Sequence, residues 1–233
     1  MSGEKRDAGT QREESAKSSQ YEDEASNNDS SNQSLHNTPG KLYTPPPLED
    51  FAWRRVESER VTDCRIFQVR RDLALNPRGG GEHNFYCIEA VDWINIIPLT
   101  ARNEVVMIEQ YRHGADEVTL EIPGGMVDED ETAETAAARE LVEETGYRAR
   151  EVLMLGRTRP NPAIQNNWLY SFLARDCRFE QEPAFDSSEW TVMRLVPLAN
   201  IPALIAEGAI THALVIAAFH WLSLYRQDLL SSA

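Results

Sequence analysis

Large apolar residues are almost absent from residues 1–40 and recur throughout the rest of the chain. A segment rich in Ser, Asn, Gln and Glu cannot bury enough apolar surface to offset the entropy lost on ordering. We therefore expect a disordered acidic and polar tail over residues 1–40. The segment TPPPLEDFAW that follows is expected to be extended, because the residue before a proline disfavours helical backbone.

Short apolar runs bounded by turn residues predict strands in the next part of the chain. Residues 60–75 and 84–90 read as strands, separated by the turn-rich stretch NPRGGGEHN. Residues 93–100 and 103–112 are more continuously apolar, which predicts two more deeply buried strands around the turn at ARNE. Repeated motifs are absent from the sequence.

The pattern changes to a helical period in the stretch GGMVDEDETAETAAARELVEETGY, residues 124–147. Asp128 and Glu131, three residues apart, resemble a capping box and predict the helix start. Gly146 is expected to end the helix, because glycine adopts the left-handed backbone of a helix terminus at little cost. Small and apolar residues at a spacing of four give the helix one slim packing face.

Three carboxylates gather on one face of this predicted helix. Glu140, Glu143 and Glu144 are spaced i, i+3 and i+4, which stacks like charges and weakens an isolated helix. A divalent cation would remove that penalty, and ligands that are all oxygen favour Mg²⁺ or Mn²⁺. The alternative is a solvated acidic face with no bound ion.

The spacing around these residues decides between the two interpretations. From Gly125 the chain reads G-x5-E-x7-R-E-U-x-E-E-x-G-U, where U is a bulky apolar residue. This arrangement resembles the signature box of the Nudix hydrolases at every fixed position. Seven fixed letters match by chance at a given start on the order of once in 10⁷.

The resemblance implies the fold class and the metal ligands. The expected fold is α/β, a Nudix fold in which an α/β/α sandwich surrounds a mixed β-sheet, with antiparallel strands at the N-terminus. The box would bind Mg²⁺ (or Mn²⁺) through Glu140, Glu143 and Glu144, assisted by the backbone carbonyl of Gly124. Metals of this kind offset diphosphate charge and lower the pKa of an attacking water.

The resemblance also implies roles for other box residues and the reaction. Arg139 would orient glutamates by paired hydrogen bonds, including those to Glu131. The reaction would be hydrolysis of a nucleoside diphosphate linked to another moiety, X.

Motifs outside the box resemble the ADP-ribose and nucleotide-sugar pyrophosphatase branch. In EQYRHG and LEIPGG, Arg112 would contact substrate and Glu121 would lie near the metals. Pro162 stands 16 residues after Gly146, where that branch often has a proline. The following AIQNN departs from the acidic pattern common in ADP-ribose enzymes, so X stays open.

A polar loop downstream would supply a further carboxylate as general base or metal ligand. Glu189 matches best by its offset from LVPL, while Glu182 and Asp186 are rivals. Glu143 in the box is the alternative base.

The last segment resembles the closing helices of the branch, and its apolar period independently predicts a packed helix. His212 and His220 are expected to cap or pack rather than to bind ligands. The resemblance implies a homodimer in which N-terminal strands cover the partner's active site. Phe85, Tyr86 or Trp93 would then stack on a base, or else pack in the core.

Charge and composition exclude some classes of binding partner. The formal charge of -15 argues against long nucleic acid and anionic membrane, since both are bound by clustered Lys and Arg. The chain shows neither a signal core nor an apolar run long enough to span a bilayer, and its 3 scattered cysteines fit a reducing compartment. We expect a cytoplasmic protein acting on a small nucleoside diphosphate derivative.

Three regions and three functions follow from the sequence. The regions are the tail (1–40), N-terminal strands as a candidate dimerisation element (41–90) and the catalytic domain (91–230). The favoured function is metal-dependent hydrolysis of ADP-ribose or a related nucleoside diphosphate sugar. The alternatives are hydrolysis of another substrate, such as a dinucleotide or nucleoside triphosphate, and a sensor that binds a nucleotide sugar without cleaving it.

Overall fold

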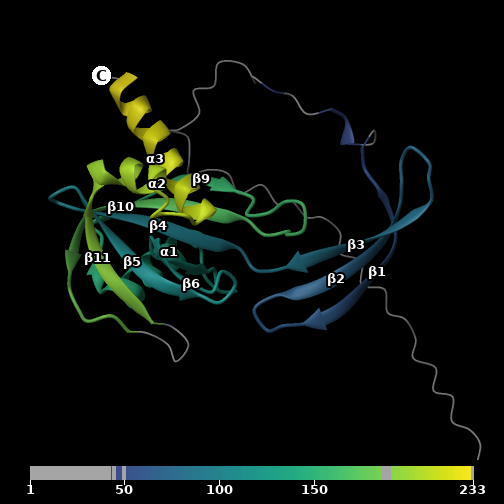
Figure 1. Cartoon of the computed structure of the whole chain (residues 1–233), viewed down its shortest axis with the longest axis horizontal. Coiled ribbons are helices and arrows are strands. Elements are labelled where there is room, and N and C mark those ends of the chain that lie inside the picture. The colour runs from purple at the N-terminus through teal and green to yellow at the C-terminus, as the bar shows by residue number, and fades with distance from the viewer. Residues whose placement is uncertain (1–42, 44–45, 49–50, 185–189, 232–233) are drawn as a thin grey trace, which may run out of the picture. The chain divides into compact units, whose positions relative to one another are not determined.

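The computed structural model describes residues 43, 46–48, 51–184 and 190–231 (Figure 1). The predicted tail over residues 1–40 lies outside the described residues. The chain divides into two compact units, Met1–Pro47 and Leu48–Ala233. The described helices and strands all lie in the second unit.

A three-stranded antiparallel sheet comes first. Its strands are β1 (Arg54–Asp63), β2 (Gln68–Leu75) and β3 (Glu82–Glu89), in the order β1-β2-β3. The prediction of strand throughout residues 60–75 was wrong, because the chain reverses between β1 and β2. The Asp63 carboxylate accepts a hydrogen bond from the Arg65 backbone N–H at 2.9 Å, and Arg65 has φ of 69°. Aspartate favours such a turn through this short-range bond.

The second sheet is mixed and has eight strands. They are β4 (Trp93–Thr100), β5 (Glu104–Arg112), β6 (Glu117–Glu121), β7 (Gly124–Met126), β8 (Tyr147–Arg148), β9 (Glu151–Thr158), β10 (Leu169–Phe179) and β11 (Thr191–Pro197). The main path is β11-β5-β4-β10-β8, with β6 on β5, β7 on β4 and β9 on β10. β10 runs parallel to β4, whereas the other pairs are antiparallel.

Helices cover both faces of the mixed sheet (Figure 1). Helix α1 (Ala133–Thr145) packs on the face that carries Ile94 and Ile96. The 3-10 turn η2 (Leu198–Asn200), α2 (Ile201–Ala206) and α3 (Ala213–Ser231) lie on the face that carries Ile97. Adjacent β4 side chains point to opposite faces, which is why this strand is apolar at successive positions. The predicted α/β/α arrangement is confirmed.

Helix α1 begins later than the sequence predicted. Thr132, rather than Asp128, is its N-cap, and the Thr132 hydroxyl accepts a hydrogen bond from the Thr135 N–H at 3.2 Å. Asp128 and Glu131 instead close a turn before the helix, with a 3.1 Å bond from the Asp128 N–H to the Glu131 carboxylate. The predicted helix end is confirmed, since Gly146 is the C-cap with φ of 69°.

Candidate active site

The acidic face of α1 and the loop before it line a cavity of about 430 Å³. This carboxylate cavity contains the three box glutamates that the sequence placed together. The residues around it are Gln110, Arg112, Gly124, Gly125, Met126, Asp128, Arg139, Glu140, Glu143, Glu144 and Ala184. Three acidic side chains beside one another need nearby cations to offset their repulsion.

Arg139 supplies one such cation. Its Nη1 donates to Glu140 at 2.9 Å and to Glu143 at 3.0 Å, while Nη2 and Nε donate to the two oxygens of Glu131 at 2.5 and 3.2 Å. The bonds to Glu131 raise the pKa of Arg139, and the same Arg139 contact lowers the pKa of Glu131. Arg139 therefore stays charged and contacts the carboxylates of Glu131, Glu140 and Glu143 together, and its orienting role stays a prediction.

Glu144 is the most enclosed of the three box glutamates, at 2% exposure. Its Oε2 accepts a hydrogen bond from the backbone N–H of Gly124 at 2.9 Å. Gly124 lies on β7, opposite Asn95 of β4, so this bond ties the helix to the sheet at the cavity wall.

The glutamate side chains of the carboxylate cavity offer oxygen atoms as metal ligands, and oxygen ligands are the type that Mg²⁺ and Mn²⁺ prefer. Among the residues that the structure describes, no three His, Cys, Asp or Glu side chains are already gathered closely enough to hold an ion. Arg139 contacts one oxygen of Glu140 and one of Glu143, which holds these two carboxylates around a guanidinium. The chemistry of the donors fits a divalent ion, and the assignment of individual ligands stays a prediction.

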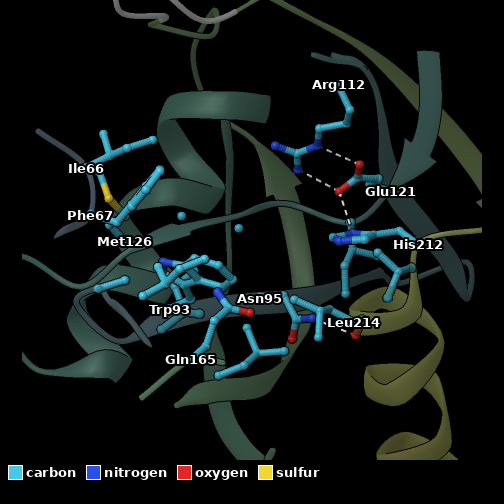
Figure 2. A pocket seen from close by; sticks show the side chains of 18 residues that line it. Ile66, Phe67, Trp93, Asn95, Arg112, Glu121, Met126, Gln165, His212 and Leu214 are labelled. Atoms are coloured by element: carbon cyan, nitrogen blue, oxygen red, sulfur yellow. Dashed lines mark hydrogen bonds and ion pairs between the residues drawn. The ribbon is translucent and has the colours of Figure 1, made fainter. Parts of the chain in front are cut away.

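A second, more apolar cavity of about 670 Å³ adjoins the first (Figure 2). It shares Arg112, Gly124, Gly125 and Met126 with the carboxylate cavity. The other side chains that line this apolar cavity are Ile66, Phe67, Ile88, Ala90, Trp93, Ile94, Asn95, Glu121, Ile122, Gln165, Leu169, His212, Leu214 and Val215. A ligand with an anionic part and a flat apolar part can therefore occupy both cavities at once.

Arg112 and Glu121 meet where the cavities join (Figure 2). Arg112 donates to both Glu121 oxygens, at 2.7 and 2.6 Å, and Thr119 Oγ1 donates to Glu121 at 2.5 Å. Burial raises the pKa of Glu121, but the hydrogen bonds from Arg112 and Thr119, together with the nearby His212 ring, outweigh it and hold that pKa well below its usual range. Side chains of the same chain thus contact both oxygens of Glu121. This arrangement allows Glu121 to orient Arg112.

His212 also contacts Glu121, although the sequence predicted only a capping or packing role for it. Its Nδ1 lies 3.0 Å from Glu121 Oε2, outside ordinary hydrogen-bond angles but close enough for an ion pair when the ring is protonated. His212 also begins α3, accepting backbone N–H bonds from Val215 and Ile216. The contact joins β6 to α3 and depends on tertiary packing, so a single sequence carries little signal for it. His220 is exposed on α3.

Two other predicted site residues lie elsewhere. Pro162 is exposed in a turn and lines neither cavity, and its contact with substrate stays a prediction. Glu182 is exposed and also lines neither cavity. The loop candidates Asp186 and Glu189 lie outside the described residues.

The described residues that flank the loop are attached to the box helix. The Ala184 N–H donates to the Glu143 carbonyl at 2.8 Å, and Thr191 Oγ1 donates to the Glu144 carbonyl at 3.4 Å. Both ends of the loop therefore meet the chain segment that carries the box glutamates.

The structure distinguishes the aromatic candidates. Trp93 lines the apolar cavity, whereas Phe85 and Tyr86 do not. Phe85 instead contacts Trp53 edge to face, with ring centroids 4.9 Å apart. Ile66 and Phe67, from the β1–β2 turn, line the cavity and were missed because the sequence reading placed them inside a continuous strand.

A model of the NUDIX domain matches residues 92–219, which is more than half of the chain. The chain belongs to the Nudix family. Within the described part of this Nudix protein, no helix combines the length and apolar character needed to cross a membrane.

Similar proteins support the branch suggested by the sequence. The Nudix chain is 24% identical to a methanol dehydrogenase activator of Bacillus methanolicus, over 75% of this chain and 94% of that protein. It is 28% identical to an ADP-ribose pyrophosphatase of Mycobacterium tuberculosis (strain ATCC 25618 / H37Rv), over 73% and 83% of the two chains. The resemblance to the ADP-ribose pyrophosphatase branch and the prediction of a pyrophosphatase hydrolase are confirmed.

A solved structure supports the fold. The crystal structure of an ADP compounds hydrolase matches with a TM-score of 0.67 and 21% identity, covering 76% of this chain and 95% of the other. The Nudix fold expected from the sequence is confirmed.

Proposed function

We propose that this Nudix enzyme hydrolyses the diphosphate of ADP-ribose, or of a related nucleoside diphosphate sugar, in a reaction that depends on Mg²⁺ or Mn²⁺. The proposal rests on one observation: the apolar cavity and the carboxylate cavity lie next to each other and share Arg112 and Gly124–Met126. The apolar cavity suits a nucleoside and the carboxylate cavity suits a metal-bound diphosphate. Water adds to one phosphorus, the bridging P–O bond breaks, and a nucleoside monophosphate and a sugar phosphate leave.

Glu140, Glu143 and Glu144 are the side chains that would hold the ions, with the Gly124 carbonyl. When bound, such ions offset diphosphate charge and lower the pKa of the attacking water. Arg139 keeps the carboxylates oriented through the contacts described above. Arg112 presents a guanidinium at the shared wall, where it can bind a phosphoryl oxygen while Glu121 fixes its direction.

The proton of the attacking water needs an acceptor. Glu189 is the proposed general base, supported by the attachment of the flanking residues Ala184 and Thr191 to the box helix. Glu143 is the alternative, since its side chain is 42% exposed and lines the carboxylate cavity. Separate Glu189→Gln and Glu143→Gln variants decide between them. In the parent, activity should rise with pH as the general base loses its proton, and the variant that lacks the base should not show this rise.

The substrate is tested by product analysis. The panel contains ADP-ribose, ADP-glucose, GDP-mannose, NADH, diadenosine polyphosphates and nucleoside triphosphates, each with Mg²⁺, Mn²⁺ or chelator. We expect AMP and ribose 5-phosphate from ADP-ribose, with loss of activity in chelator. Failure to cleave any compound, combined with a higher melting temperature in ADP-ribose, would favour the sensor function instead.

A homodimer, with residues 41–90 as its dimerisation element and residues 91–230 as the catalytic domain, is part of this proposal. In support, all ten residues of β1 are exposed, and apolar side chains at Val56, Val61 and Tyr86 are exposed on the same three-stranded sheet. Sedimentation equilibrium of the full chain should give twice the mass of 26.4 kDa. A single-chain mass at micromolar concentration would contradict it. The cytoplasmic location also stays a prediction.

A further inference from the structure

Gln165 lies in the loop between β9 and β10, and its backbone is held between two elements. The Ile88 N–H donates to the Ile164 carbonyl at 2.7 Å, and the Asn166 N–H donates to the Ile88 carbonyl at 3.3 Å. These bonds form a parallel bridge between Ile88, in β3, and Gln165. The Gln165 N–H also donates to the Asn161 carbonyl at 2.8 Å, which closes a turn containing Pro162. The loop thus presents Gln165 on a fixed backbone.

The side chain of Gln165 lines the apolar cavity (Figure 2). Its carboxamide has no hydrogen-bond partner among the residues that the structure describes. Several other polar groups of the cavity wall already have protein partners. Arg112 and His212 contact Glu121, and Asn95 Nδ2 donates to the Leu214 carbonyl at 3.0 Å, whereas Asn95 Oδ1 has no partner among the described residues. Gln165 is therefore a polar group of this wall available for a ligand.

The position of Gln165 suits the base rather than the diphosphate. It lines the apolar cavity but not the carboxylate cavity, whereas Arg112 lines both. Figure 2 shows Arg112 with Glu121 on one side of the apolar cavity and Trp93 with Gln165 on the other. A nucleotide whose diphosphate meets the box glutamates would extend its base away from Arg112. Trp93 and Phe67 supply aromatic surface for the faces of that base.

We propose that Gln165 selects adenine by hydrogen bonding to the edge of the base, an inference that rests on the proposed function. A carboxamide presents a donor and an acceptor side by side, which matches the adjacent N6 donor and N7 acceptor of adenine. Hypoxanthine has acceptors at both O6 and N7, so one end of the carboxamide faces an unmatched group. Pro162 then acts indirectly, by shaping the turn that holds Gln165.

Binding to the full-length protein tests this assignment. The probes are the α,β-methylene analogues of ADP-ribose and of its inosine counterpart, titrated calorimetrically with Mg²⁺, so that hydrolysis does not interfere. We expect the parent to prefer the adenine analogue by about 5- to 150-fold, the usual range for one two-bond contact to a base. Gln165→Ala should reduce the preference to less than about 3-fold.

Two further variants complete the design. Gln165→Glu keeps the size but offers only acceptors, so it should weaken binding of both analogues, because N7 of either base then faces a carboxylate oxygen, while N6 of adenine keeps an acceptor. Gln181→Ala removes an exposed amide outside both cavities and should keep it. Because the Gln165 side chain has no partner in the described structure, its variants should melt within about 2 °C of the parent.

The outcomes separate this inference from the proposed function. Absence of an adenine preference in the parent, or an unchanged preference in Gln165→Ala, would overturn the role of Gln165 even if ADP-ribose is cleaved. A preference that disappears in Gln165→Ala, in a protein that cleaves no nucleoside diphosphate sugar, would support the role of Gln165 and overturn the proposed function alone.

Discussion

Arg112 and Glu121 form a two-bond ion pair, with Nε to Oε1 at 2.7 Å and Nη2 to Oε2 at 2.6 Å. Glu121 is 2% exposed, whereas 42% of the Arg112 side chain is exposed. The buried carboxylate thus holds one end of the pair rigidly, while the guanidinium faces the junction of the two cavities. This geometry makes Glu121 a positioning residue whose effect on substrate is exerted through Arg112.

Glu121→Gln should lower kcat/KM by about 10- to 100-fold and destabilise the fold by on the order of 2 kcal/mol. The variant loses a charged acceptor that three side chains contact. Steady-state kinetics and urea denaturation measure the two effects. Glu117→Gln, an exposed glutamate on the same strand, is the matched control and should leave both quantities near the parent values.

The same pair predicts a pH dependence of stability. Because the folded pKa of Glu121 lies below its unfolded value of about 4.3, the unfolded state binds more protons. The stability that ionised Glu121 adds to the folded state is therefore fully present above about pH 4.3. It is lost as the pH falls from there towards the folded pKa of Glu121. Free energies of unfolding from pH 7 to 3 should show the gap between parent and Glu121→Gln narrowing below about pH 4. A gap that widens in acid would contradict this assignment.

Glu144→Gln should reduce turnover by about 10³-fold or more while the fold is kept, because it removes a charged oxygen ligand from the proposed metal site. Initial rates at saturating Mg²⁺ and ADP-ribose provide the measurement. Glu134→Gln, on the exposed first turn of α1, controls for loss of a carboxylate from the helix. Parent-like turnover in Glu144→Gln would refute the role of this residue in metal binding.

Arg139→Met should lower the melting temperature in chelator, and Mg²⁺ should raise it more in the variant than in the parent. Without the guanidinium, Glu140 and Glu143 lose the cation that now offsets their repulsion. Differential scanning calorimetry over a Mg²⁺ titration tests the expectation. Equal Mg²⁺ shifts in the two proteins would show that Arg139 and the ion do not act on the same carboxylates.

Gly125→Ala should impair activity more than stability. A Cβ built at Gly125 lies 2.1 Å from Glu140 Oε1, so the carboxylate must move from its present position. We expect kcat to fall by at least about 10-fold, in line with displacement of a charged group at a catalytic site. Gly114→Ala is the control, because its Cβ would meet nothing within 4 Å. Identical kcat values for the two variants would contradict the proposed place of Glu140.

The sequence by itself determined the box helix and its charges. The helical period of 3.6 residues and the continuous apolar runs are local properties, so they predicted α1, the apolar strands β4 and β5 and the alignment of Glu140, Glu143 and Glu144. Gly146 signalled the helix end for the same local reason. The start was misplaced because Asp128 and Thr132 both carry capping side chains, and the contact between Arg139 and Glu131 draws Glu131 into the turn before the helix.

Only the tertiary structure decided which distant residues share a cavity. His212, just before α3, meets Glu121 of β6 because α3 packs on β4, β9 and β10 of the mixed sheet, and Gln165 lines the apolar cavity because its loop bonds to β3. Phe67 reaches the same wall through a chain reversal that Asp63 and Arg65 form between two strands. Contacts between residues far apart in sequence depend on how whole elements pack. Local propensity and spacing carry no information about them.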